Sequence, residues 1–406
     1  IFVLISLIII SSCRKSTDVD PDKNILHIAL KSKIDSIDPV RSYDTVSANI
    51  VYQVHEQLYQ YHYLKRPYAL EPLLAQEIPK IENNGTRYII KIKKNIRYHD
   101  HPAFKGQPRY LIAEDFINEI KRLALKNLGS NGWWLFDGKI KGLNEFRDKA
   151  QTFEDIKKIP VSGLNAPDDY TLVIDLIAAY PQMIYALSMS FVSPVPWELI
   201  EYTKNFLNDV AIGTGPFYIS EYSPLAGAKI RKFPFYHDEM YPSEGDRQAI
   251  EENLLTDAGK KLPFLDGVNF SIIEEPQPAW LNFLKKKIDY VIVAKDNYSS
   301  IVATDGGLSS ELKTQNVQLV IAPTLVYWWL SFNMKDHLLG KNKLLREAIA
   351  YAIDVDRYIQ TFTNNVGLKA NSIYPPGIPG YNPTATLPYK YDKEKAKILL
   401  AKAGFP

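Results

Sequence analysis

Few residues of this sequence are of types and spacings that could carry out chemistry. The chain contains no Gly-x-Ser-x-Gly elbow for a serine nucleophile, no His-Glu-x-x-His zinc motif and no Gly-x-x-x-x-Gly-Lys phosphate loop. Its one cysteine, Cys13, excludes thiol pairs and disulfides. We therefore assign no catalytic residue and expect that the protein is not an enzyme.

Two short motifs were considered as ligand sites. His99, Asp100 and His101 are adjacent, and imidazole and carboxylate groups bind zinc and similar ions. Exposed histidines are common, however, so we expect no metal site and no cofactor. The segment Gly213-Thr214-Gly215-Pro216 is rich in glycine but lacks a following lysine, which favours a backbone turn over a phosphate site.

Composition narrows the class of protein. The 406 residues are 46% hydrophobic and 23% charged, with a formal net charge of +2 from residues spread along the chain. These values are typical of a soluble globular protein of two or three packed units, and there is no basic stripe for nucleic acid. The 26 tyrosines and 6 tryptophans suit a ligand cleft, and they suit a core equally well.

The N-terminal segment resembles a lipoprotein signal. Residues 1–10 are apolar, Ser11 and Ser12 are small, and the chain turns polar directly after Cys13. The apolar run is too short to span a bilayer but suits a secretory signal that ends at a lipid-modified cysteine. We therefore expect residues 1–13 to be the signal with Cys13 as the lipidation site, and 14–24 to be a linker. The alternative is a buried strand with an incidental thiol.

Both ends of the chain are expected to be incomplete. The first residue is Ile1, with no initiator Met and no basic leader before the apolar run. The last residues, Gly404-Phe405-Pro406, follow directly on a helical pattern. A longer native protein is the expectation at each end.

Hydrophobic periodicity predicts a mixture of helices and strands without a regular repeat, and thus an α/β or α+β protein. Asp354 and Asp392 are predicted helix caps, and Gly404 fits a helix exit. The predicted helices are 46–61, 113–124, 344–353 and 393–403. The predicted strands are 26–30, 88–93, 171–176, 270–273, 288–293 and 317–321.

Several segments, in order, resemble one family: the large extracellular solute-binding proteins of dipeptide, oligopeptide and nickel importers. Each is weak alone, but together they cover residues 26–405. The segments are Ser36-Ile37-Asp38-Pro39, Leu73-Leu74-Ala75-Gln76, Arg97-Tyr98-His99-Asp100, Leu111 to Phe116, Ile212 to Phe217, Leu262 to Asp266, Phe332-Asn333, Arg346 to Asp354, Ile373 to Gly377, and Tyr391 to Phe405.

The resemblance implies an α/β, two-lobed periplasmic binding protein (class II-like) with an extra small α+β domain, here with the third domain incomplete. It implies domain I at 25–57 and 165–275, domain II at 58–164 and domain III at 276–406. Residues 237–262, rich in charge and poor in aliphatic side chains, are expected to be a surface insertion. Members usually continue well past the helix at the end of this chain, and that stretch carries the acid that pairs with a peptide α-amino group.

The resemblance also suggests which residues contact a ligand, and for each aromatic the alternative is core packing. Asp44 could hold a cationic group, and adjacent tryptophans cannot all face one core. The predicted ligand contacts are Tyr43, Asp44, Thr45, Trp133, Trp134, Phe136, Tyr327, Trp328 and Asn333.

The function that the resemblance implies is solute capture for an ABC importer. We expect a monomeric lipoprotein, held at the membrane of the cell envelope and facing the periplasm, that binds oligopeptide- or dipeptide-like solutes in an interlobe cleft. Its partners would be the permease and ATPase subunits. The alternatives are the same scaffold with another solute (a nickel chelate, haem, a murein peptide or an oligosaccharide) or a secreted, lipid-anchored peptide hydrolase.

Overall fold

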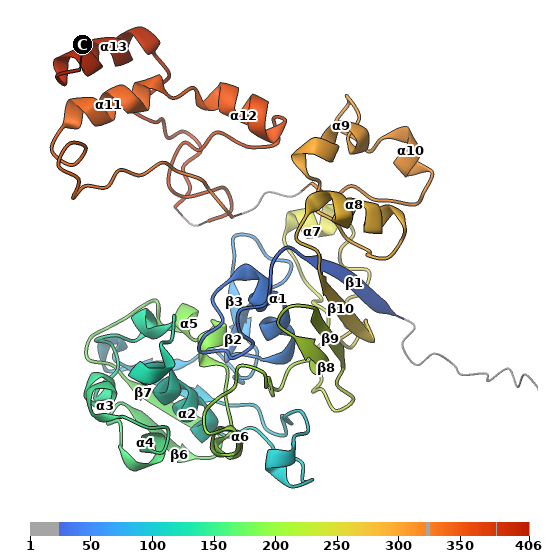
Figure 1. Cartoon of the computed structure of the whole chain (residues 1–406). Coiled ribbons are helices and arrows are strands. Elements are labelled where there is room, and N and C mark those ends of the chain that lie inside the picture. Colours follow the sequence, from blue (N-terminus) through green and yellow to red (C-terminus); the bar gives the residue numbers. More distant parts are fainter. Residues whose placement is uncertain (1–23, 322–324, 379, 406) are drawn as a thin grey trace, which may run out of the picture.

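A computed structural model describes residues 24–321, 325–378 and 380–405 (Figure 1). The first sheet contains strands that are far apart in the sequence. Its order is β1 (Ile25–Leu30), β10 (Gly267–Ile272), β9 (Gly227–Lys232) and β8 (Phe217–Ser223). The pair β1 and β10 is parallel, and the other pairs are antiparallel.

Helix α1 (Thr45–Val54) covers this sheet with a stripe of Val46, Ile50 and Val54, spaced four residues apart. Residues with this spacing share one helix face, so the stripe packs against Phe217 and Ile230 of the sheet in one small core. The predicted helix 46–61 is therefore too long. It ends at Val54 because the chain beyond it makes backbone hydrogen bonds with residues 69–75, forming the hairpin of β2 (Tyr59–Tyr61) and β3 (Leu70–Pro72).

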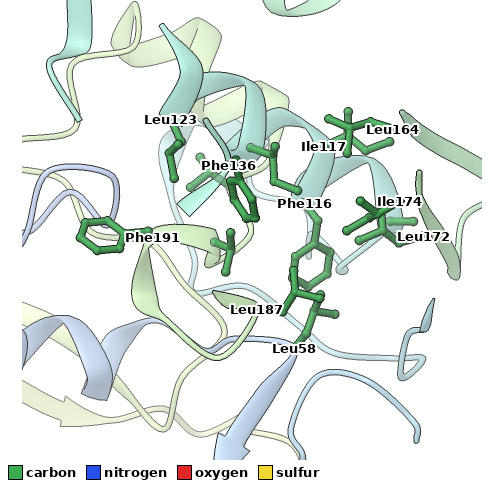
Figure 2. Packing of buried hydrophobic residues seen from close by; sticks show 14 of the residues in the cluster. Leu58, Phe116, Ile117, Leu123, Phe136, Leu164, Leu172, Ile174, Leu187 and Phe191 are labelled. Carbon is green, nitrogen blue, oxygen red and sulfur yellow. The ribbon is translucent and has the colours of Figure 1, made fainter. Parts of the chain in front are cut away.

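A second, wholly antiparallel sheet has the order β4 (Lys80–Glu82), β5 (Arg87–Lys91), β7 (Thr171–Asp175) and β6 (Leu164–Asp168). Helix α2 (Ala113–Ala124) is buried around nearly its whole circumference and packs against β6 and β7, as Figure 2 shows for Phe116, Ile117, Leu172 and Ile174. The predicted helix 113–124 and the strand near 171–176 are confirmed.

Shorter helices surround the second sheet. They are α3 (Leu143–Lys149), α4 (Asp155–Lys158), α5 (Met183–Ala186), α6 (Trp197–Thr203) and the 3-10 turns η1 (Asn83–Gly85), η2 (Pro102–Phe104), η3 (Lys126–Leu128), η4 (Trp133–Leu135) and η5 (Ser190–Val192). The continuous core of this unit extends to Leu207. The boundary expected at residue 165 does not agree with this pairing, because β6 and β7 complete the sheet of the second unit. The chain returns to the first sheet only after Leu207.

Two glycines allow that return. A Cβ on Gly213 would lie 2.1 Å from the carbonyl oxygen of Val54, and one on Gly215 would lie 2.6 Å from that of Gln53. Atoms this close cannot coexist, so only glycine lets the returning chain lie against the end of α1. The glycine-rich segment is thus a close backbone approach, in agreement with the predicted turn.

Residues 236–262, which we call the strap, connect β9 to β10 and contain α7 (Arg247–Glu251). The strap lies against the β2–β3 hairpin loop: the Asp246 amide donates to the Leu64 carbonyl over 2.8 Å, and Lys65 pairs with Glu244. Tyr63 meets Tyr241 edge-on at 5.9 Å between ring centroids. The predicted surface insertion is therefore a connection between the two units.

The C-terminal part begins with α8 (Pro276–Leu284), which has proline in its first turn, and continues through η6 (Lys295–Asn297), α9 (Tyr298–Ile301) and α10 (Ser310–Lys313). Beyond it lie α11 (Lys343–Ala352), α12 (Val355–Thr363) and α13 (Lys393–Lys402), drawn in orange and red in Figure 1. Asp354 and Asp392 cap α12 and α13, as predicted. The predicted helices 344–353 and 393–403 are confirmed to within one residue.

The predicted strands 288–293 and 317–321 are wrong for the described residues, which form no strand there. Tyr290 makes an isolated bridge to Ile28, and the Asp289 amide donates to the His27 carbonyl over 2.9 Å. An apolar pattern becomes a strand only where a neighbouring edge supplies hydrogen bonds over several residues. Here the edge of β1 bonds with the segment only around Asp289 and Tyr290.

Candidate functional site

The opening loop, residues 36–45, is held by a buried ion pair. Arg122 of α2 donates from both terminal guanidinium nitrogens to the two carboxylate oxygens of Asp38, over 3.3 and 2.8 Å. The exposed fractions of these two side chains are 0% and 1%. A bidentate pair of this kind fixes direction as well as distance, so the second unit determines where the loop lies.

Two further side chains accept hydrogen bonds from Arg122. Its Nη1 donates to Glu119 over 2.7 Å and its Nε to Asn205 over 2.6 Å. The pKa of Glu119 is raised to about 8: burial raises it, the Arg122 charge opposes that rise, and the Asp38 charge adds to it. Nearby His55 is buried, and its pKa is lowered to about 3, first by burial and then by His99 and Arg122. The cluster is thus a low-dielectric site built around one guanidinium.

The loop makes further contacts with the segment after α2. The Ser130 hydroxyl donates to the Val40 carbonyl over 2.7 Å, and the Asn131 amide group donates to the Arg41 carbonyl over 3.0 Å. Loop residues 38–41 are therefore bound to the second unit at three places, although they follow β1 of the first sheet in the chain.

The three ligand contacts predicted on this loop lie at its end. The Tyr43 side chain is 68% exposed, with its ring centroid 6.3 Å from that of Phe191, and Thr45 is exposed. Asp44 caps α1: its Oδ1 accepts from the amides of Val46 and Ser47 over 2.9 and 2.8 Å. The carboxylate thus stabilises the helix start, and a cationic ligand group would share it with these amides.

The tryptophan segment also packs against Phe191. A Cβ on Gly132 would lie 2.5 Å from the Phe191 ring, so the chain entering η4 packs directly against it. Trp134 is 57% exposed, whereas Trp133 is half-buried with the Arg147 guanidinium 4.4 Å from its ring. Phe191 therefore contacts both the segment that carries Tyr43 and the segment that carries Trp134.

Phe136 is placed differently from its neighbours. It is fully buried and packs in the core of the second unit, close to Leu123 in Figure 2. Contact with a ligand would require this core to open, so the side chain's observed role is packing. The local sequence does not predict that Phe136 is buried while Trp134 is exposed, because side chains in and next to a 3-10 turn change faces within one or two residues.

The third group of predicted contacts lies in the C-terminal part. Trp328 is 90% exposed, Tyr327 packs against Trp329 at 5.0 Å between centroids, and the exposed Asn333 accepts from the Lys335 amide. This segment, between α10 and α11, lies well away from η4 in Figure 1. The structure does not bring it together with Tyr43 and Trp134.

The histidine pair has a structural role. His99 is buried, its Nε2 is 2.9 Å from the Gly215 carbonyl, and the Gly213 amide donates to its Nδ1 over 3.4 Å. Burial lowers its pKa to about 4. His101 accepts from the Ala103 amide at the start of η2. Among the described residues, no group of three or more His, Cys, Asp or Glu side chains could hold a metal ion.

Sequence reasoning missed a set of three exposed tyrosines. Tyr52 on α1, Tyr61 on β2 and Tyr185 on α5 are 44%, 48% and 49% exposed. Tyr52 lies off the buried stripe of α1, which was a detectable signal. Tyr61 and Tyr185 are 124 residues apart in the sequence, so no local pattern could have grouped them.

A separate cavity of about 1340 Å³ lies in the C-terminal part. It is lined by α8, the segments 288–293 and 315–321, and the end of α12, including Trp280, Phe283 and Phe362. None of the predicted ligand contacts lines this cavity. The loop of residues 36–45, by contrast, is held in place by the buried contacts of Asp38.

The chain belongs to the bacterial extracellular solute-binding proteins, family 5, whose sequence model matches residues 69–406. It is 24% identical over 330 residues to the dipeptide-binding protein of Escherichia coli (strain K12), covering 80% of this chain and 53% of that protein. It is 24% identical over 359 residues to heme-binding protein A of Haemophilus influenzae, covering 87% and 57%. The chain thus spans somewhat more than half the length of these relatives.

Solved structures show the same fold. The periplasmic binding protein DppA from Helicobacter pylori, in complex with peptide STSA, matches with a TM-score of 0.67 and 22% identity, covering 94% of this chain and 66% of that one. The Escherichia coli murein tripeptide binding protein MppA matches with a TM-score of 0.68 and 20% identity, covering 95% and 67%. The predicted α/β periplasmic binding protein fold is therefore confirmed.

Association with a membrane is a separate question from the fold. No helix among the described residues has the length and apolar character needed to cross a bilayer. Cys13 and the predicted signal lie outside the described residues, so lipidation stays a prediction.

Proposed function

We propose that this chain is the solute-binding component of an ABC importer, and that it captures peptide-like solutes and delivers them to a permease and its ATPases without covalent chemistry. Family membership supports solute binding, and the dipeptide-binding relative supports a peptide as the solute. The bound solute would lie between a lobe that contains the first sheet and a lobe formed by residues 276–406.

One observation carries the proposal: the buried pair of Asp38 and Arg122 holds the loop that presents Tyr43, Asp44 and Thr45. A binding site gains affinity when its contact residues are already fixed before the ligand arrives. Exposed Trp134 stands in the same region and offers an aromatic face. Together these residues provide an anionic group and two aromatic surfaces for one end of a peptide.

We further propose that the protein is a monomer, anchored by acyl chains on Cys13 and facing the periplasm. One acyl chain binds a membrane only marginally, so an anchor of more than one chain is expected. Replacement of Cys13 by Ser in the complete gene should release the protein from the membrane fraction. Retention of the Cys13→Ser protein in membranes would contradict the anchor.

The solute is tested most directly by mass spectrometry of small molecules that co-purify with the protein, followed by thermal unfolding with candidate peptides. A ligand at 100 times its dissociation constant adds ~2.7 kcal/mol to the free energy of unfolding. Peptides that raise the melting temperature and remain intact support the proposal. Cleavage of those peptides without stabilisation would instead indicate a hydrolase.

Haem is a second candidate solute, favoured by the similarity to heme-binding protein A. Exposed aromatic side chains such as Tyr43 and Trp134 suit a flat macrocycle as well as a peptide. Titration with haem, followed by its absorption spectrum, separates the two. A saturable spectral change with no response to peptides would favour haem.

A further inference from the structure

Four tyrosines form a row next to the opening loop, and we call them the tyrosine row: Tyr52, Tyr61, Tyr68 and Tyr185. They come from α1, β2, the β2–β3 hairpin loop and α5. Tyr61 and Tyr68 meet edge-on, with ring centroids 5.8 Å apart. Tyr68 is half-buried and the other three are 44–49% exposed, so phenol rings from four elements share one accessible surface.

The row is continuous with the proposed site. The Tyr43 ring stacks near Phe191, and the adjacent Ser190 amide donates to the Tyr52 hydroxyl over 3.3 Å. Tyr52 and Tyr185 are both electrostatic neighbours of Tyr61. Thr45 and Tyr52 are seven positions apart on α1, a rise of about 10 Å at 1.5 Å per residue. An extended peptide covers that distance with about three residues. A dipeptide held at Tyr43 would not reach the row, and a longer peptide would.

The surroundings of Tyr61, within the row, are uncharged. The pKa of Tyr61 is raised by burial and then by Tyr185 and Tyr52, so its electrostatic neighbours are other phenols. At Tyr68 a cation is present: Arg66 lies 4.1 Å above that ring, and its guanidinium donates to the carbonyls of Tyr63 and Lys65. A neutral aromatic surface favours apolar or aromatic groups over charged ones, because a charge there would lose water without gaining a partner.

The far end of the row faces the C-terminal part. A Cβ on Gly377 would lie 4.0 Å from the Tyr68 ring and 3.7 Å from Leu325. The loop around Gly377 therefore lies next to Tyr68. Ligand sites commonly lie where two domains approach each other.

We propose that the tyrosine row is a subsite for an uncharged, apolar or aromatic side chain of an extended peptide of four or more residues, one end of which is held by the loop of residues 43–45. This inference rests on the proposed function and adds the length and the side-chain class of the solute.

Binding of three synthetic pentapeptides by the full chain, measured by calorimetry, tests the inference. The peptides are Ala-Ala-Ala-Phe-Ala, Ala-Ala-Ala-Asp-Ala and penta-alanine, with Ala-Ala as the short probe. We expect the Phe peptide to bind at least about ten-fold more tightly than the Asp peptide, in line with loss of an aromatic contact at a binding surface. Ala-Ala should bind more weakly than penta-alanine.

Variants locate the effect. Tyr61→Ala and Tyr185→Ala should each reduce affinity for the Phe peptide by about five- to ten-fold and leave Ala-Ala unchanged. Tyr61→Phe should retain affinity, because the ring and not the hydroxyl makes the contact. The matched control is Tyr202→Ala, which removes a 60% exposed tyrosine on α6 next to His101. Thermal unfolding of each variant verifies that it is folded.

Each alternative outcome is distinguishable. If pentapeptides bind but folded Tyr61→Ala and Tyr185→Ala bind the Phe peptide as wild type does, the subsite is wrong and the proposed function stands. If Ala-Ala binds as tightly as the Phe peptide, the length assignment is wrong. If no peptide binds but haem or an oligosaccharide binds and depends on Tyr61, both the peptide function and this inference are wrong.

Discussion

Arg122 and Asp38 lie 84 positions apart in the sequence, yet they form a bidentate ion pair between the second unit and the loop that leaves the first sheet. Both side chains are shielded from solvent, so neither can exchange its partner for water. The pair contributes less to net stability than its geometry suggests, because desolvation of two charges opposes their attraction. Its clearest effect is positional.

Removal of one member should be costly. Arg122→Met keeps most of the side-chain volume but leaves Asp38 and Glu119 buried without their cation, and we expect a loss of about 3–5 kcal/mol in the free energy of unfolding. Urea denaturation measures it. Lys126→Met is the matched control, since it breaks an exposed pair with Asp148 and should cost less than ~1 kcal/mol. Equal losses in the two variants would contradict the importance of the buried pair.

The two roles of Asp44 can be separated. Asn is as good a helix cap as Asp, so Asp44→Asn should keep the stability of α1 while removing the charge offered to a solute. Asp44→Ala should cost about 1 kcal/mol in unfolding free energy as well. If Asp44 holds a cationic group, both variants bind peptides with a free amino terminus more weakly, and acetylated peptides show no difference. Unchanged affinity in Asp44→Asn would leave capping as its sole function.

The tryptophan pair should divide between binding and stability. Trp134→Ala removes an exposed ring, so we expect about ten-fold weaker peptide binding and a stability change within ~0.5 kcal/mol. Trp133→Ala removes a half-buried ring packed against Arg147 and the core, with an expected loss of roughly 2 kcal/mol. Calorimetric titration and urea denaturation of both variants provide the comparison. The reverse pattern would place Trp133 in the site.

His55 makes stability depend on pH. Its pKa is about 3 in the folded protein and about 6.5 when unfolded, so below pH 6.5 only the unfolded chain binds this proton. The free energy of unfolding should therefore fall as the pH drops from about 6.5 towards 3, by up to ~1.4 kcal/mol per pH unit from this group. His55→Met should lose that slope.

Urea denaturation at pH 7, 6 and 5 measures the slope, with His337→Met as the control that removes an exposed histidine. The difference between wild type and His55→Met should grow with falling pH in favour of the variant. Parallel curves for the two proteins would show that His55 is not buried as described.

The strap should detach from the hairpin loop when a larger side chain replaces Gly245 at their contact. A Cβ on Gly245 would lie 2.7 Å from the Ala249 Cβ and 3.1 Å from the Leu64 Cβ, so Gly245→Val should cost roughly 1–3 kcal/mol. We expect faster proteolysis within residues 236–262 while the second sheet stays protected. Ser243→Val, at an exposed neighbouring position, is the control. Equal cleavage of both variants would mean that the strap is not held there.

Local signals predicted the helices well. The signals for α13 lie close together in the sequence: the cap Asp392, the apolar stripe within residues 396–403, and Gly404 after the helix. The start, the buried face and the end of this helix can therefore be inferred from one short segment. For α2 the apolar stripe and the acidic first turn were the local signals. The strands at 288–293 and 317–321 were mispredicted because strand formation depends on a partner edge, which the pattern of one segment does not contain.

The ligand contacts stay a prediction. The resemblance pointed to Tyr43 and Trp134, and both side chains are exposed in the structure, with the Tyr43 ring beside Phe191. The resemblance could not indicate the role of Arg122, because an arginine on an amphipathic helix normally faces solvent. The burial of Phe136 and the grouping of Tyr61 with Tyr185 also depend on tertiary packing, which spacing in the sequence does not reveal.

The parallel pairing of β1 with β10 has a consequence for the order in which the sheets can form. All four strands of the second sheet lie within residues 80–175, so that sheet has its full complement once residue 175 has been synthesised. β1, by contrast, precedes its neighbour in the sheet by more than 230 residues. Until residue 272 has been made, the first strand of the described chain has no strand to pair with.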